Sequence, residues 1–144
     1  MVCLDSAPLD APPNSRGLLD GIHVLVVDDE PDPRALFRDV LEEAGARVTA
    51  VPSAREAIAA MERELPDVLV SDIMMPNEDG YWLIEAVRAL RRDGGRRPRA
   101  LAITGDSRRH SRTRVLTAGY DAHLGKPVGV DTLCVAVARL AGRF

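Results

Sequence analysis

Short apolar runs alternate along this chain with longer segments in which apolar residues recur every three or four positions. The short runs are rich in β-branched residues, which is typical of buried strands. They span 23–28, 47–51, 67–71, 99–104 and 121–124. The longer segments predict helices, because one face of each is apolar. They cover 31–44, 78–91, 107–118 and 130–141, together with a helix that Ser53 caps and whose apolar face reaches Leu65.

Strands that alternate with helices predict an α/β fold, in which a parallel sheet is covered on both faces. Right-handed connections bring the carboxyl ends of the strands to one edge, where such sheets bind their ligands. The length of 144 residues suits one domain. Residues 1–20 hold Pro8, Pro12 and Pro13 without apolar periodicity. We therefore expect a flexible leader or linker over 1–20 and a single domain over 21–144.

Composition narrows the class of protein. The chain has 46% hydrophobic residues, 28% charged residues and a net charge of −3. These values are typical of a globular protein and lack the basic footprint of a nucleic-acid binder. No apolar run is long enough to span a membrane, the first residues do not resemble a secretory signal, and two cysteines favour free thiols. We expect a cytoplasmic protein that binds neither nucleic acid nor membrane directly.

Polar residues stand where the predicted strands end. Asp28 and Asp29 end the first strand, Asp72 ends the third, Thr104 ends the fourth, and Lys126 follows the fifth. Three carboxylates at one edge repel one another unless a cation neutralises them or one of them is protonated. Oxygen ligands favour a hard cation such as Mg²⁺, and Mn²⁺ would suit the same ligands. The pattern therefore predicts a divalent-cation site at this edge.

Lys126 is the only lysine among 19 basic residues. A compact ammonium on a flexible stem suits a phosphate or carboxylate in a tight pocket better than a planar guanidinium does. An oxygen nucleophile, a metal, this ammonium and the Thr104 hydroxyl make up the set that phosphoryl transfer needs. The three histidines, His23, His110 and His123, are too scattered to indicate a zinc site.

The ordered set of residues resembles the receiver domains of two-component response regulators, including those similar to chemotaxis regulators. The resemblance spans about 21–141 and rests on Asp28 with Asp29, Asp72 within DIMMPNEDG, Thr104 with Gly105, and Lys126 with Pro127. It implies a flavodoxin-like (βα)5 fold, a doubly wound sheet of five parallel strands in the order 2-1-3-4-5. It also implies a phosphorylation switch that passes its signal on by changing shape.

The resemblance assigns the acceptor and its metal by position. Asp72 matches the phosphoacceptor of the family. Asp28 and Asp29 match the acid pair that holds Mg²⁺, and Met74 matches the position whose backbone carbonyl completes the metal ligands. Gly80 matches the glycine that opens the third helix.

The resemblance also assigns the residues that respond to phosphorylation. Lys126 matches the lysine that pairs with the phosphoryl group, and Thr104 matches the switch hydroxyl. In the family the bond before the proline matching Pro127 is cis. His123 stands where a rotating tyrosine or phenylalanine is usual, and Val128 stands where an aromatic residue often follows the Lys-Pro pair. Whether His123 takes part in switching is therefore open.

The expected function is that of a phosphoacceptor receiver domain. It would accept a phosphoryl group from a histidine kinase or a histidine phosphotransfer protein and act on a downstream protein, with dimerisation left open. It would be no enzyme beyond self-catalysed phosphoryl transfer and autodephosphorylation. Both a single-domain regulator and the receiver of a hybrid histidine kinase agree with the sequence.

Two alternatives come from other functional classes. A metal-dependent phosphatase of related fold would need a general acid two residues after Asp72, where Met74 stands and cannot donate a proton. A pseudo-receiver that binds partners without phosphorylation would not need the complete set of acids and the lysine.

Overall fold

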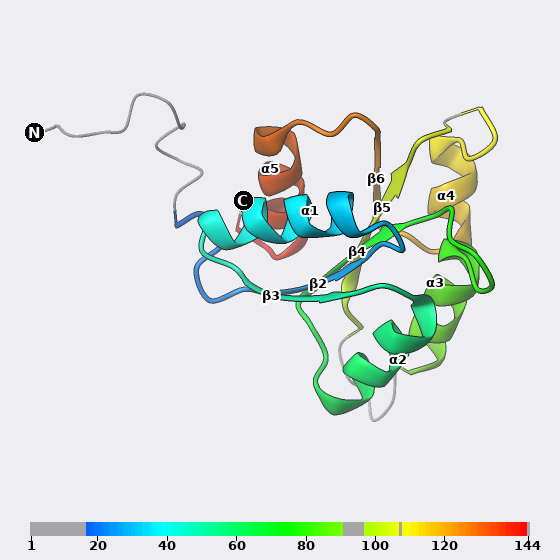
Figure 1. Cartoon of the computed structure of the whole chain (residues 1–144), viewed down its shortest axis with the longest axis horizontal. Helices are drawn as coiled ribbons and strands as arrows, with labels where there is room; N and C mark the ends of the chain where they lie inside the picture. The colour runs from blue at the N-terminus through cyan, green and yellow to red at the C-terminus, as the bar shows by residue number, and fades with distance from the viewer. Residues whose placement is uncertain (1–16, 91–96, 107, 144) are drawn as a thin grey trace, which may run out of the picture.

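The computed structural model describes residues 17–90, 97–106 and 108–143, which form a five-stranded parallel sheet with helices on both faces (Figure 1). The strands are β2 (His23–Val27), β3 (Arg47–Val51), β4 (Val68–Asp72), β5 (Arg99–Thr104) and β6 (Ala122–Gly125). The helices are α1 (Pro31–Glu43), α2 (Ala54–Arg63), α3 (Gly80–Ala89), α4 (Arg112–Ala118) and α5 (Val130–Leu140). The strand order β3-β2-β4-β5-β6 is the order 2-1-3-4-5 when strands are counted along the chain. The predicted flavodoxin-like fold is thus confirmed.

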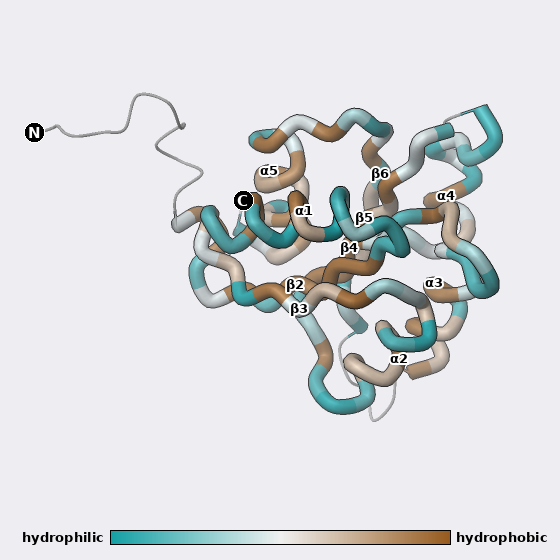
Figure 2. The backbone as a smooth tube through the Cα atoms, in the orientation of Figure 1, coloured by the Kyte–Doolittle hydropathy of each residue, from teal (hydrophilic) through white to brown (hydrophobic). Residues whose placement is uncertain are grey.

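Two layers of helices cover the sheet. α1 and α5 lie on one face, and α2, α3 and α4 lie on the other (Figure 1). Side chains alternate between the faces of a strand, so Val24 and Val26 pack under α1 and α5 while Leu25 and Val27 pack under α2 and α3. The central strands β2 and β4 are buried along their whole length, and Figure 2 shows hydrophobic residues along them. None of the helices in the described ranges is long and apolar enough to cross a membrane.

Three helices begin or end at least two residues inside the predicted limits. α3 begins at Gly80 and not at 78, because Asp79 Oδ1 accepts hydrogen bonds from the first backbone N–H groups of the helix. α4 begins at Arg112 and not at 107, because Ser111 takes the capping position. α2 ends at Arg63, so Leu65, expected on its apolar face, lies beyond the helix and is 46% exposed.

The packed structure includes residues before the predicted boundary at 20. Leu19 is fully buried in the cluster under α1 and α5. Its N–H donates to the carbonyl of Ala44 (2.9 Å), and an Arg143 guanidinium N–H donates to the carbonyl of Asp20. Residues 1–16 lie outside the described part of the chain, so the leader predicted there stays a prediction.

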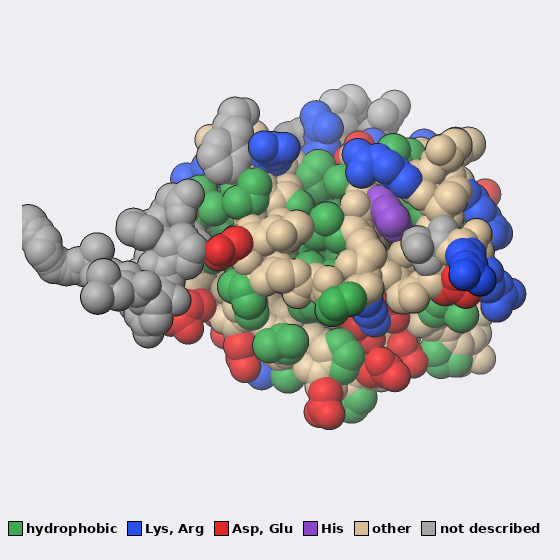
Figure 3. Space-filling view, turned by 90° about the horizontal axis from the view of Figure 1, so that it is seen from above, with side chains coloured by type: hydrophobic (Ala, Val, Ile, Leu, Met, Phe, Trp, Pro, Cys, Tyr) green, Lys and Arg blue, Asp and Glu red, His purple; other side chains and the backbone are tan. Residues whose placement is uncertain are grey.

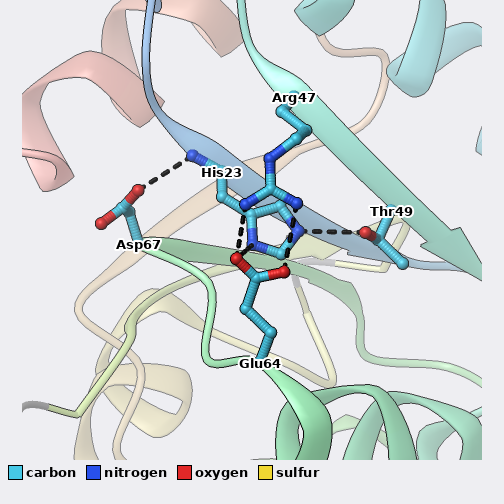
Figure 4. A network of polar contacts seen from close by, with 5 residues as sticks. All are labelled: His23, Arg47, Thr49, Glu64 and Asp67. Carbon is cyan, nitrogen blue, oxygen red and sulfur yellow. Dashed lines mark hydrogen bonds and ion pairs between the residues drawn. The ribbon is translucent and has the colours of Figure 1, made fainter.

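A polar network lies near the amino end of β2, opposite the edge where the strands end (Figure 4). The His23 N–H donates to Asp67 Oδ2 (2.9 Å), and His23 Nε2 lies 3.0 Å from Thr49 Oγ1. In the same network, Arg47 forms a bidentate ion pair with Glu64. The network joins β2, β3 and the end of α2. It includes His23, one of the three scattered histidines, and none of the residues predicted to be functional.

Candidate functional site

The predicted site residues meet at the carboxyl edge of the sheet. Asp72 is the last residue of β4, and Thr104 is the last residue of β5. Asp28 and Asp29 directly follow β2, and Lys126 directly follows β6. These four strands are neighbours in the sheet, so residues up to about 100 positions apart lie at one edge because the strands are parallel.

Three carboxylates form the centre of the site. Asp28, Asp29 and Asp72 each offer one oxygen, and these oxygens lie within 4.8 Å of one another. Asp28 is fully buried, Asp72 is 6% exposed, and Asp29 is half-buried. Acidic side chains held this close are expected to bind a cation, since each oxygen is an acceptor and none can serve as a donor while ionised.

Asp28 provides an independent test of whether a metal fits. Its Oδ1 accepts a hydrogen bond from the Glu30 N–H (2.9 Å). Its Oδ2 is buried and has no hydrogen-bond partner among the residues that the structure describes. An orphaned carboxylate oxygen in a buried position is costly, and a divalent cation with a preference for oxygen ligands would satisfy it. The donor set therefore fits Mg²⁺ or Mn²⁺, and it lacks the nitrogen and sulfur ligands typical of zinc.

Burial and neighbouring carboxylates raise the pKa values of Asp72 and Asp28 when no cation is bound. Burial raises the pKa of Asp72 from 3.8 to about 6, Lys126 opposes this rise, and Asp28 and Asp29 add to it. Burial likewise raises the pKa of Asp28. A bound cation would favour the ionised form of both groups, which is the form a nucleophile requires.

Lys126 supplies the positive charge of the site. Its Nζ lies 3.8 Å from Asp72 Oδ2, and its side chain is 30% exposed. The backbone N–H of Lys126 donates to the carbonyl of Thr104 (2.7 Å). This hydrogen bond joins the ends of β5 and β6. The Lys126–Pro127 peptide bond is cis. The ammonium is thus near the Asp72 carboxylate and still open to an incoming group. Figure 3, a view of the molecule from above, shows basic side chains mainly in its upper and right-hand parts and acidic side chains mainly along its lower edge.

The side chains of Thr104 and His123 are hydrogen-bonded to each other. Thr104 is buried, and its Oγ1 lies 2.9 Å from Nε2 of the half-buried His123. Burial lowers the pKa of His123, and the charge of Arg112 lowers it further. His123 therefore contacts the predicted switch hydroxyl through a hydrogen bond from or to a ring nitrogen. The ring of a tyrosine or phenylalanine contains only carbon atoms and could not make this bond.

Gly80 packs against the backbone of Asp72 and Ile73. A Cβ at this position would stand 2.8 Å from the Ile73 Cα and 3.0 Å from the Asp72 carbonyl oxygen, so only glycine allows this close approach. The Tyr120 hydroxyl donates to the Gly80 carbonyl (2.7 Å). The Ser71 hydroxyl donates to the Asp72 carbonyl (2.9 Å). Buried polar contacts thus hold the backbone on either side of Asp72.

A second set of residues lies beside Asp72, and the sequence pattern does not identify it. The Met74 backbone N–H lowers the pKa of Asp72, and the Met74 side chain contacts His110, which in turn contacts Tyr81. In the sequence, His110 is one of three scattered histidines and stands in a polar, arginine-rich segment. Its partners are 29 and 36 positions away, and apolar periodicity does not predict contacts at such separations.

The model of the response regulator receiver domain family matches residues 24–138, most of the chain. The chain belongs to the response regulator receiver domain family. The receiver is also similar to solved receivers. It is 30% identical to the receiver domain of the Pseudomonas aeruginosa sensor histidine kinase PA1611, described with a magnesium ion in its active-site cleft, with a TM-score of 0.76 over 85% of this chain and 98% of that one.

The similar proteins include both histidine kinases and a transcriptional regulator. An uncharacterized 14.6 kDa protein of Leptolyngbya boryana is 48% identical over 73% of this chain and 79% of its own length. The sensor histidine kinase RcsC of Salmonella typhimurium is 32% identical over 86% of this chain but only 13% of the kinase. The regulatory protein TcrA of Mycobacterium tuberculosis is 34% identical over 92% of this chain and 51% of that protein. The receiver is thus homologous to receivers found in hybrid histidine kinases and in response regulators.

Proposed function

We propose that Asp72 accepts a phosphoryl group from the phosphohistidine of a histidine kinase or a histidine phosphotransfer protein. The observation that carries this proposal is the meeting of Asp72 with two further carboxylates within 4.8 Å and with the Lys126 ammonium at 3.8 Å. Each group has a distinct part in phosphoryl transfer. The family match supports the same role, because receivers pair with such kinases and phosphotransfer proteins.

In the transfer step, a carboxylate oxygen of Asp72 attacks the phosphorus in line. A new P–O bond forms as the P–N bond to the donor imidazole breaks, and the imidazole nitrogen keeps the electron pair. The product is an acyl phosphate, which water later hydrolyses in the same site to regenerate the carboxylate. The chain thus acts on itself, without turnover of a separate substrate.

Asp28, Asp29 and Asp72, with the Met74 backbone carbonyl, would hold the divalent cation. When bound, Mg²⁺ would neutralise charge that develops on the phosphoryl oxygens. Asp28 holds its position through the Glu30 N–H and keeps its free Oδ2 available to a ligand. The magnesium ion described for the PA1611 receiver supports this assignment.

Lys126 and Thr104 would bind the transferred group. The ammonium is near enough to Asp72 Oδ2 to pair with a phosphoryl oxygen on that atom. Thr104 would donate its hydroxyl to another oxygen, which requires it to leave His123 Nε2. The exchange of these partners would move the ends of β5 and β6, and an unidentified downstream protein would detect that movement. Ligand-driven shifts require such a difference in contacts between two states.

The proposal is tested by labelling with acetyl phosphate and Mg²⁺, followed by intact-mass measurement. We expect one phosphoryl group on the wild-type chain and none on Asp72→Asn. Asp39→Asn is the matched control, because Asp39 is exposed on α1 and pairs only with its neighbour Arg38 among the described residues. Equal labelling of wild type and Asp72→Asn would refute the proposal, and so would labelling that continues after Mg²⁺ is chelated.

A further inference from the structure

A contact between two loops lies beside the proposed acceptor. His110, in the loop between β5 and α4, is only 8% exposed, and both of its ring nitrogens are engaged. Nδ1 lies 2.9 Å from the hydroxyl of Tyr81 on α3, and Nε2 lies 3.1 Å from the sulfur of Met74 in the loop after β4. The imidazole thus joins the loop that follows Thr104 to the loop that follows Asp72.

The chemistry of the partners determines how His110 is bonded. A thioether sulfur can only accept a hydrogen bond, so the ring hydrogen is on Nε2 and points to Met74. Nδ1 is then an acceptor, and the Tyr81 hydroxyl donates to it. Burial holds the pKa of Tyr81 above its ordinary value, which keeps the hydroxyl protonated. The His110 ring is therefore held in one tautomer and one orientation.

Tyr81 is itself held in place from the other side. The guanidinium of Arg114, on α4, lies 4.7 Å from the centre of the Tyr81 ring, within the range of a cation–π contact. The same guanidinium donates to the carbonyl of Arg109 (2.8 Å) in the loop before α4. The contacts therefore link α3, α4 and the loop between β5 and α4.

Met74 connects this group to the acceptor. Met74 lies two residues after Asp72, and its backbone N–H lowers the pKa of that carboxyl group. Its sulfur accepts a hydrogen bond from His110. Met74 is 49% exposed and lines an open groove with Ile73, Met75, Pro76, Asp79 and His110. Because half of its surface faces solvent, burial in the core does not account for its position, and the contact with His110 is the specific interaction that its side chain makes.

We propose that His110 is a positioning residue for the phosphoacceptor. Through Met74 it fixes the loop that directly follows Asp72, and through Tyr81 it is anchored to α3. This inference rests on the proposed function of Asp72 and adds a residue to that site. It identifies the loop after Thr104 as part of the support for the attacking carboxylate.

The test compares variants that remove the two hydrogen bonds in different ways. His110→Phe keeps the ring volume and loses both bonds, whereas His110→Gln keeps an N–H that can reach Met74. Met74→Leu removes the sulfur acceptor. Arg108→Ala is the matched control, because Arg108 is exposed in the same loop. The measurements are the initial rate of phosphorylation by acetyl phosphate at saturating Mg²⁺, the Mg²⁺ affinity from the fluorescence of Trp82, the only tryptophan, and Tm.

We expect His110→Phe and Met74→Leu each to lower the phosphorylation rate about five- to tenfold, the effect of losing one useful hydrogen bond. His110→Gln should retain most of the rate, and Arg108→Ala all of it. When His110→Phe and Met74→Leu are combined, the two reductions in phosphorylation rate should not add, because both substitutions remove the same His110–Met74 contact. A purely structural role for His110 would lower Tm and leave the rate of the folded protein unchanged.

The outcomes separate this inference from the proposed function. If wild type is labelled and His110→Phe is labelled at the same rate, or if the two losses add, the positioning role is wrong and the acceptor role stands. If wild type is not labelled although Mg²⁺ changes the fluorescence of Trp82, the acceptor role fails and the positioning role fails with it. Met74→Leu alone decides the matter if His110→Phe does not fold, since it removes the same contact.

Discussion

Asp72 is expected to destabilise the metal-free receiver at neutral pH, so Asp72→Asn should make the protein more stable. Burial and two neighbouring carboxylates raise the pKa of Asp72 from 3.8 to about 6. A shift of that size corresponds to about 3 kcal/mol of cost for the ionised form. Asparagine has no charge to desolvate, but it loses the attraction of Lys126. We expect a gain of about 1–3 kcal/mol, or roughly 4–10 °C in Tm.

The dependence on pH gives the sharper test. The folded state binds the Asp72 proton more tightly than the unfolded state, so the contribution of Asp72 to wild-type stability is greatest in acid and is lost as pH rises through about 6. Asp72→Asn lacks this contribution, and groups far from Asp72 cancel in the difference between the two proteins. Asp28, which repels Asp72, strengthens the same trend. The advantage of the variant should be full at pH 8, shrink through pH 6 and vanish near pH 4.

Urea denaturation of both proteins in EDTA, from pH 4 to 8, measures this difference. Repeating the series with Mg²⁺ should stabilise wild type far more than Asp72→Asn, because the cation binds the folded state through the carboxylate. The reasoning is refuted if the variant is no more stable than wild type in EDTA at pH 8, or if its advantage does not change with pH.

Three further predictions concern the same edge of the sheet. Lys126→Arg should slow labelling by acetyl phosphate by about tenfold or more while Mg²⁺ affinity stays near wild type, because a planar guanidinium keeps the charge but cannot replace a compact ammonium 3.8 Å from Asp72. Gly80→Ala should cost about 1–3 kcal/mol in urea denaturation, since its Cβ would lie 2.8 Å from backbone, whereas Gly105→Ala, whose nearest neighbour would be 3.8 Å away, should be close to neutral. By NMR, the His123 ring should titrate below its ordinary value of 6.5, and Arg112→Ala should move its pKa upward, because burial and the Arg112 charge both lower it; a midpoint above 6.5 would contradict this.

The convergence of the acidic residues could be predicted because it depends on few assumptions. Parallel strands end at one edge, so the alternation of strands and helices places Asp28, Asp72 and Lys126 at the same edge of the sheet. The strand order itself came from the resemblance to receivers and not from periodicity. The shared edge predicted from the alternation and the strand order implied by the resemblance both agree with the observed sheet.

The contacts that periodicity does not encode were missed. The run before α4 is polar, so nothing in it distinguished Ser111 from earlier positions as the helix cap, and the helix was placed too early. The partners of His110 depend on how two loops pack over α3. The hydrogen bond from Thr104 to His123 depends on rotamers at adjacent strand ends. Such features arise from tertiary packing, which a single sequence pattern does not specify.

The burial of Leu19 has a practical consequence for anyone who trims this protein. The family match begins at residue 24 and ends at 138, yet Leu19 and Ile22 fill part of the interior, and Arg143 reaches back to the Asp20 carbonyl. A fragment cut at the limits of the match would open a hole beneath α1 and expose apolar surface. Expression should start no later than Gly17 and extend through Arg143.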